Sequence, residues 1–255
     1  MPNRPSSATP IAILSALLQE QQGLMELLHR PQKVAHAGRD FWLGELHGRP
    51  VVLALSKIGK VAAATTATAL IERFGVRRMV FTGVAGGLGA GVNVGDVVVA
   101  SDFVQHDLDA SPLFPRYEVP LYGRSRFEGD AALTALLFSA ASAALGDGGA
   151  SAAFPGARAH LGLIASGDRF VSGAGESRGL HAALAGAGHE VLAVEMEGAA
   201  VAQVCHDYGV PFAAVRTISD RADDSAHVDF PRFVEEVASR YAHAIVAKLL
   251  LSLEP

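Results

Sequence analysis

The chain has 255 residues, a length at which a single α/β core still folds as one domain. Half of the residues are hydrophobic and only 18% are charged, a balance typical of a central sheet covered by helices on both faces. The net charge of -5, without a basic run, argues against nucleic acid, and no apolar run is long enough to span a membrane. We therefore expect a small-molecule partner, no nucleic acid and no membrane.

Apolar runs and helical periodicity predict alternating strands and helices. In chain order, we expect a strand at residues 11–14, a helix at 17–28, a strand at 51–55, a helix at 61–74, strands at 79–82 and 97–100, a helix at 131–144, strands at 161–165 and 191–194, a helix at 198–208, a strand at 212–217 and a helix at 230–251. This pattern predicts a mainly parallel or mixed sheet sandwiched by helices. We expect a single-domain α/β fold with a central mixed β-sheet flanked by helices in a three-layer sandwich. The domain would cover residues 11–255, after a flexible N-terminal segment at 1–10.

Two connecting segments lack the periodicity of a helix or a strand. Residues 107–130 carry three Pro and three Arg and predict a long irregular excursion from the sheet, of the kind that often lines a site. Residues 146–156 are rich in Gly and Ala and predict a surface connection.

Cysteine usage and the start of the chain bear on the compartment. The single cysteine, Cys205, cannot form an internal disulfide, and no His/Cys group has the spacing of a structural zinc site. The first ten residues are polar and lack the order of a secretory signal. We expect a cytoplasmic protein without a metal.

Polar residues that follow a predicted strand are the first candidates for a site, because ligands of α/β sheets bind beyond the carboxyl ends of the strands. Five places qualify, which are Glu20 and the segments 82–87, 166–171, 194–197 and 216–220. The segment 82–87 is glycine-rich, which allows close approach of a ligand but also suits an ordinary turn. It has neither the Lys of a P-loop nor the full dinucleotide fingerprint, so we reject both.

The carboxylates in these places each have a structural and a functional interpretation. Glu195 and Glu197 could simply favour a helix N-terminus, but two of them around Met196 also suit the hydroxyls of a vicinal diol such as ribose. Asp220 could cap a turn or act as a general acid. Glu20, considered alone, is a solvated helical charge.

Taken together and in this order, the segments resemble the 5'-methylthioadenosine/S-adenosylhomocysteine nucleosidase family, within the purine nucleoside phosphorylase superfamily. The resemblance covers most of the chain and is carried by residues 11–20, 59–63, 82–87, 94–98, 166–168, 194–197 and 215–220. It implies a nucleoside phosphorylase/hydrolase-like sandwich without a cofactor. It also implies hydrolysis of the N-glycosidic bond of 5'-methylthioadenosine or S-adenosylhomocysteine, which releases adenine and a 5'-substituted ribose.

The resemblance implies two catalytic carboxyl groups. Asp220 would donate a proton to adenine N7 and accept a hydrogen bond from the 6-amino group, which selects 6-amino purines. Glu20 would orient or deprotonate the water that attacks the anomeric carbon. Burial should raise the pKa of the acid, whereas the base should remain ionised.

The same resemblance implies a set of substrate-binding residues. Phe170 would stack on the base, and the backbone of Val171 would contact its Watson-Crick edge. Glu197 would hold the ribose hydroxyls, with Met196 packed against the sugar. Glu195 and Ser219 complete the substrate-binding set, and the supporting residues would be Arg216, Val84 and Gly86.

Two departures from the family pattern concern the sugar and its 5' group. Val84 stands where the family often has Ser or Thr, so one polar contact near the sugar is absent. Residues 107–130 do not follow the family pattern closely, although in relatives this part helps form the pocket for the 5' substituent. Residues of a neighbouring subunit contribute there too, so the resemblance implies a homodimer.

The closest alternative is a phosphate-dependent purine nucleoside phosphorylase. Hexameric phosphorylases place a Gly-Asp-Pro-x-Arg phosphate loop after the first strand, where residues 15–20 of this chain read SALLQE. A Glu beside phosphate adds repulsion, whereas a Glu beside water supplies a base, so charge favours hydrolysis. A hydrolase of another adenosine derivative, such as aminofutalosine, and a nucleoside-binding sensor without turnover stay open.

Overall fold

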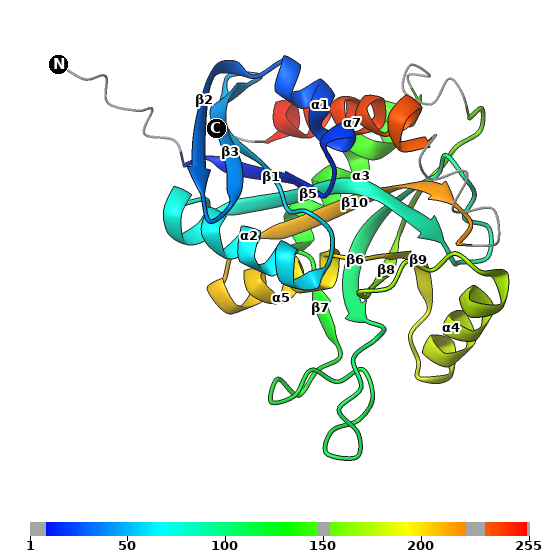
Figure 1. Cartoon of the computed structure of the whole chain (residues 1–255). Coiled ribbons are helices and arrows are strands. Elements are labelled where there is room, and N and C mark those ends of the chain that lie inside the picture. The colour runs from blue at the N-terminus through cyan, green and yellow to red at the C-terminus, as the bar shows by residue number, and fades with distance from the viewer. Residues whose placement is uncertain (1–8, 147–153, 223–232, 254–255) are drawn as a thin grey trace.

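The computed structural model describes residues 9–146, 154–222 and 233–253, which form a ten-stranded mixed sheet with helices on both faces (Figure 1). The strands are β1 (Ile11–Ser15), β2 (His29–His36), β3 (Arg39–Leu46), β4 (Arg49–Leu55), β5 (Arg78–Gly87), β6 (Val97–Gln105), β7 (Arg126–Glu128), β8 (Ala159–Ser166), β9 (Val191–Glu195) and β10 (Phe212–Asp220). The helices are α1 (Leu18–Glu26), α2 (Lys60–Phe74), α3 (Ala131–Gly146), α4 (Ala174–Gly186), α5 (Gly198–Tyr208) and α7 (Ser239–Ser252), the last preceded by a π-helical turn (Val234–Ala238).

Alternate residues of the central strands face opposite helical layers. On β1, Ala12 and Leu14 pack into one apolar cluster with α2 and α5, whereas Ile11 and Ile13 pack into another with α1, α3 and α7. Figure 1 shows these two groups of helices on opposite faces of the sheet. The predicted three-layer α/β fold is therefore confirmed.

Five of the strands close into a ring, which the apolar runs do not predict. β5 pairs in parallel with both β1 and β10, and its last residues, Gly86 and Gly87, pair antiparallel with β9. β10 in turn pairs with β6, β6 with β8, and β8 with β9. Register shifts in three of these ladders permit the curvature that closure needs. The ring brings the carboxyl ends of β5, β8, β9 and β10 together.

Four elements, namely β2, β3, α4 and β7, have no predicted counterpart. The β2–β3 hairpin includes an edge strand, β2, that is almost wholly exposed and so carries no apolar run. The helix α4 buries only Leu184, and its glycines weaken the helical pattern. β7 takes the last residues of the predicted excursion, while the chain between β6 and β7 runs in turns and projects from the body (Figure 1).

Parts of three predicted segments fall outside the described residues. They are most of the flexible segment at 1–10, the middle of the connection at 146–156, and the first residues of the helix at 230–251. Within the described ranges, no helix is both long and apolar enough to cross a membrane.

Candidate active site

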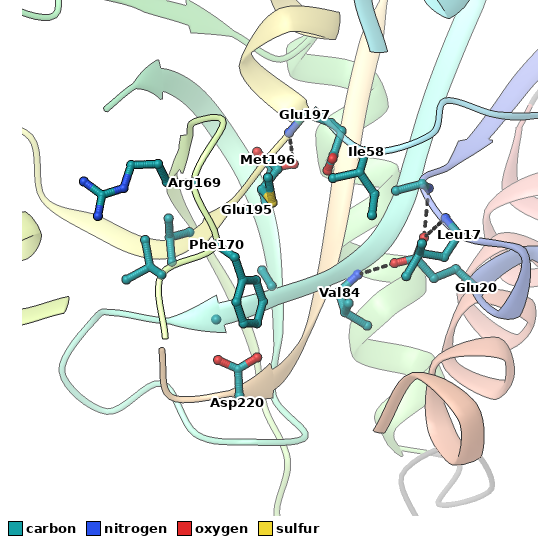
Figure 2. A pocket seen from close by; sticks show the side chains of 15 residues that line it. Leu17, Glu20, Ile58, Val84, Arg169, Phe170, Glu195, Met196, Glu197 and Asp220 are labelled. Carbon is teal, nitrogen blue, oxygen red and sulfur yellow. Dashed lines mark hydrogen bonds between the residues drawn. The ribbon is translucent and has the colours of Figure 1, made fainter. Parts of the chain in front are cut away.

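A cavity of about 310 Å³ opens where the strands end, as expected for a ligand site of an α/β sheet. Figure 2 shows Phe170 and Asp220 toward one end of the cavity and Glu20 toward the other. Of the predicted site residues, Arg216 and Ser219 are buried and do not line the cavity. The lining consists of Ala16, Leu17, Glu20, Ile58, Val84, Ala85, Gly86, Arg169, Phe170, Val171, Val194, Glu195, Met196, Glu197 and Asp220.

Glu20 is buried at the start of α1, so it is not the solvated helical charge that its position also allowed. Its Oε2 accepts hydrogen bonds from the backbone amides of Ala16 and Leu17, each at 2.8 Å, and its Oε1 accepts from the amide of Val84 at 3.1 Å. Burial raises the pKa of Glu20 above its ordinary value, while the three amides and the positive charge of Arg216 oppose the rise. Such a carboxylate is suited to accept a proton from water.

Asp220 ends β10 at a bulge. The register of β10 on β5 shifts between Ile218 and Asp220, which leaves Ser219 as the extra residue. The Ser219 hydroxyl donates to Oδ2 of Asp220 at 2.8 Å, and the amide of Ala222 donates to Oδ1 at 2.7 Å. Asp220 therefore caps a turn, and its buried carboxyl group also lines the cavity. The structural and the functional interpretation of this residue are compatible.

Two glycines of β5 allow both carboxyl groups to lie against this strand. A Cβ added to Gly83 would be 3.0 Å from Oε1 of Glu20, and one added to Gly86 would be 3.0 Å from Oδ1 of Asp220. At either position a side chain would have to displace a carboxylate. Gly86 belongs to the predicted supporting residues, and Gly83 lies in the same glycine-rich turn, which was predicted to allow close approach of a ligand.

Glu195 lines the cavity, but both of its oxygens accept hydrogen bonds from the protein itself. The amides of Glu197 and Gly198, at the start of α5, donate to it, and so does the hydroxyl of Ser166. Arg216 forms a buried ion pair with it at 2.7 Å. The helix-terminal interpretation of the acidic pair thus applies to Glu195. These four donors make it a support for α5 and Arg216.

Glu197 is held from a different direction. Its Oε1 accepts a hydrogen bond at 2.8 Å from the amide of Gly59, whose φ of 97° is unfavourable for residues with a side chain. Burial, followed by the negative charge of Glu195, raises the pKa of Glu197 to about 8, against the Gly59 amide and the charge of Arg216. A buried carboxyl group with one protein donor remains well placed to bind a ligand hydroxyl.

The remaining walls are mostly apolar. Phe170 and Val171 follow β8, and the Phe170 ring is 45% exposed while Val171 is buried. Met196 lies between the two glutamates, and Val84 of β5 faces the same cavity. A partly exposed ring at the cavity can stack on a flat ligand, because aromatic faces favour such contacts.

Comparisons with known proteins identify the family of this chain. The sequence model of the phosphorylase superfamily matches residues 10–251. The 5'-methylthioadenosine/S-adenosylhomocysteine nucleosidase of Shewanella denitrificans is 35% identical over 241 residues, which cover 94% of this chain and 98% of that protein. The chain belongs to this nucleosidase family. The resemblance drawn from the sequence segments is confirmed.

Solved structures extend the likeness to the nucleosidase fold. The nucleosidase of Neisseria meningitidis, in complex with methylthio-immucillin-A, is 36% identical with a TM-score of 0.84, covering 96% of this chain and 100% of that one. The native futalosine hydrolase of Helicobacter pylori strain 26695 is 33% identical with a TM-score of 0.84, covering 96% and 99%.

Several cavity residues of this nucleosidase-family chain were missed because they are apolar and carry no chemical signal. Ala16 and Leu17 flank Glu20, and Ile58 precedes α2. Conversely, the cavity lining within the described residues includes none from 107–130, so this excursion does not line the cavity of its own chain. In the described ranges, no group of three His, Cys, Asp or Glu side chains is arranged to hold a metal ion.

Proposed function

We propose that this enzyme hydrolyses the N-glycosidic bond of 5'-methylthioadenosine, S-adenosylhomocysteine or both, and releases adenine and a 5'-substituted ribose. The observation that carries the proposal is the pair of buried carboxyl groups, Glu20 and Asp220, toward opposite ends of one cavity. Bond cleavage builds positive charge on the sugar and negative charge on the departing base. The reaction therefore needs a general base beside the sugar, at one end of the cavity, and a general acid beside the purine, at the other end.

Asp220 is the proposed general acid. Its proton passes to N7 of adenine while the bond between C1' and N9 breaks and the bonding electrons move into the base. Ser219 and the Ala222 amide hold the carboxyl group during this step. A carboxyl oxygen also accepts from the 6-amino group, so a 6-oxo purine would place one acceptor against another and be rejected.

Glu20 is the proposed general base. It accepts a proton from the water molecule whose oxygen forms the new bond to C1'. The sugar then leaves with a hydroxyl group at C1', and adenine, protonated at N7 by Asp220, leaves as a neutral molecule. The amides that hold Glu20 fix its direction of approach, with Val84 supplying one of them. Gly86 leaves room for the acid at the other end of the cavity.

The substrate would lie between these two groups. Phe170 would stack on adenine and the backbone of Val171 would contact its Watson-Crick edge, while Glu197 would bind the ribose hydroxyls beside Met196. Because the oxygens of Glu195 already accept from protein donors, its proposed role is to position Arg216 and the start of α5.

Charge favours water over phosphate as the nucleophile. Three acidic side chains besides Asp220 line the cavity, namely Glu20, Glu195 and Glu197. Arg216 is paired with Glu195, and Arg169 at the rim is paired with Glu176 at 2.7 Å. Glu197, with its pKa raised to about 8, is largely protonated near pH 7, and Glu195 is neutralised by Arg216, so the repulsion of phosphate rests on Glu20. Neutral water avoids this repulsion. The likeness to the futalosine hydrolase keeps a second candidate, the hydrolysis of another adenosine derivative such as aminofutalosine.

We also propose a cytoplasmic homodimer in which a neighbouring subunit completes the pocket for the 5' substituent. Exposed apolar side chains near the cavity mouth and on the projecting excursion support this proposal, since they would be covered in a dimer. They are Ile58, Val61, Leu113 and Leu121. Cys205, buried as a free thiol, suits a reducing compartment.

The test is to incubate the purified protein with each nucleoside, with and without phosphate, and to identify the sugar released. We expect adenine release at full rate in phosphate-free buffer, with a free 5'-substituted ribose as the second product. A strict phosphate requirement and a ribose 1-phosphate product would establish the phosphorylase alternative. Turnover of aminofutalosine alone would select the second hydrolase candidate, and binding without turnover would select the sensor.

A further inference from the structure

The loop after β8, which carries Phe170, is tied to α2 by Asp168. Oδ1 of Asp168 accepts a hydrogen bond at 2.8 Å from the backbone amide of Lys60, the first residue of α2. The amide of Asp168 donates in turn to Oδ2 of Asp107 at 2.8 Å. The Lys60 ammonium completes the network through an ion pair with Oδ1 of Asp107 at 2.6 Å.

The same helix end holds the proposed ribose-binding carboxylate. The amide of Gly59, next to Lys60, donates to Oε1 of Glu197 at 2.8 Å. The first amides of a helix have no partner within the helix, so they are available for side chains from elsewhere. Two adjacent amides at the amino end of α2, those of Gly59 and Lys60, thus hold one carboxylate from each of two cavity segments. A Cβ on Gly59 would be only 3.1 Å from Oδ1 of Asp168, so the close approach depends on glycine.

Lys60 keeps the acidic side of this network charged. Although burial acts to raise the pKa of Asp107, its bonds to the Lys60 ammonium and the Asp168 amide, and the charge of Lys60, lower it below its ordinary value. Lys60 also donates to Oε1 of Gln105 in β6 at 3.0 Å. The β8 loop, α2 and the end of β6 are therefore connected by charge-assisted bonds.

We propose that Asp168 is a positioning residue that sets the Phe170 loop against the cavity by anchoring it to the amino end of α2. The inference rests on the proposed function, in which Phe170 stacks on adenine. Asp168 itself is not among the described residues that line the cavity, so it acts through Phe170 and Val171. Base binding and ribose binding would then share one support.

Loss of the anchor should weaken base binding more than the chemical step. Without the carboxylate of Asp168 the loop loses its bond to the Lys60 amide but keeps the bond from its own backbone amide to Asp107. Part of the ordering of the loop must then occur when adenine binds, which lowers affinity. We expect Asp168→Ala to raise KM, and the Kd for adenine, about 3- to 10-fold, with kcat within about twofold of wild type. Asp168→Asn keeps an oxygen for the Lys60 amide, so all three constants should stay within about twofold.

The experiment compares wild type, Asp168→Ala, Asp168→Asn and the control Asp40→Ala. Asp40 lies on the β2–β3 hairpin, where its half-exposed carboxylate forms an ion pair with Lys33 at 2.6 Å. The measurements are kcat and KM with 5'-methylthioadenosine, the Kd for adenine by calorimetry, the thermal midpoint, and hydrogen exchange at the Lys60 amide. We expect faster Lys60 exchange and higher KM and Kd only in Asp168→Ala, at an unchanged midpoint.

Two results would overturn the proposal. One is unchanged exchange at the Lys60 amide in Asp168→Ala, since the anchor would then be absent in solution. The other is a defect in Asp168→Ala that lowers kcat and leaves KM unchanged, or a defect of the same size in Asp168→Asn. If wild type releases no adenine, the proposed function fails instead, and the exchange rate together with adenine binding still decides the role of Asp168.

Discussion

The two ends of the cavity hold a carboxyl group by different means. Glu20, where water is proposed to attack, accepts hydrogen bonds from three backbone amides. Asp220, at the base end, accepts from the hydroxyl of Ser219 and from the amide of Ala222. Amide donors favour the ionised form, whereas a hydroxyl donates to a carboxylate but can also accept from a carboxylic acid. Two similar carboxyl groups can therefore divide the work of general base and general acid through their surroundings.

Removal of the acid should give the largest effect. Asp220→Asn keeps an oxygen for the Ala222 amide, so the turn should survive, but the amide side chain cannot transfer a proton to N7. We expect kcat to fall about 100- to 10,000-fold with a smaller change in KM. Steady-state kinetics and a thermal melt of the variant check this. A folded variant that keeps more than about a tenth of wild-type kcat would show that Asp220 is only a cap.

A second substrate separates the two ends. In a 5'-methylthioriboside of nitrophenol, the nitrophenolate leaving group departs without needing a proton. Asp220→Asn should therefore lose far less activity on this substrate than on the nucleoside. An equal loss on both substrates would mean that the substitution disturbs the sugar or the water, and that the acid has been misassigned.

Crowding the water end should give the next largest effect. A Cβ at Gly83 would approach Oε1 of Glu20 to 3.0 Å, so Gly83→Ala should displace the base and lower kcat about 10- to 100-fold. Because the defect lies in water activation, it should be equal for the two leaving groups. Gly175→Ala in α4, where an added Cβ meets nothing within 4 Å, is the matched control. Wild-type kinetics in Gly83→Ala would remove Glu20 from the water end.

The elements that pack by simple periodicity were predictable from sequence, and the ring was not. Strands such as β1 and helices such as α2 have apolar residues at the spacing that burial demands. Ring closure depends on β10 reaching β5 and β6 at once, and on a bulge at Ser219, neither of which leaves a periodic signal. The β2–β3 hairpin lies at an exposed edge, where burial imposes little pattern.

The cavity residues were predictable for a different reason. Polar residues after buried strands meet at one edge of the sheet, and the family resemblance supplied their proposed roles. The resemblance assigned the ribose hydroxyls to Glu197, but the residue pattern alone could not distinguish it from Glu195, since one ends β9 and the other comes two residues later. Glu195 binds the start of α5, whereas Glu197 faces Gly59. This division depends on contacts with segments far along the chain, including Arg216.

The ribose contact, between the two ends, should give an intermediate effect. Glu197→Gln leaves a ribose hydroxyl poorly satisfied, so we expect kcat/KM to fall about 5- to 150-fold with the fold intact. The loss should shrink on a substrate without a 2'-hydroxyl, and equal losses would place Glu197 away from the diol. Glu195→Gln provides a contrast, because it removes the negative charge that pairs with the buried Arg216 and should lower the thermal midpoint.

The smallest expected effect is a change in how stability depends on pH. Burial and the charge of Glu195 raise the pKa of Glu197 from 4.5 to about 8, so the folded chain holds this proton more tightly than the unfolded chain. Between these two pKa values the unfolded chain has already released the proton, and the stability that Glu197 contributes is lost as pH rises. Glutamine cannot ionise, so Glu197→Gln should lack this part of the decline.

Scanning calorimetry from about pH 5 to about pH 8 should show a smaller fall of the thermal midpoint in Glu197→Gln than in wild type, by a few degrees. Asp40→Asn, which removes an exposed carboxylate, should keep the wild-type slope. If the thermal midpoint of Glu197→Gln falls as steeply with pH as that of wild type, Glu197 ionises at its ordinary pKa. Its burial and the charge of Glu195 would then affect this pKa less than the structure implies.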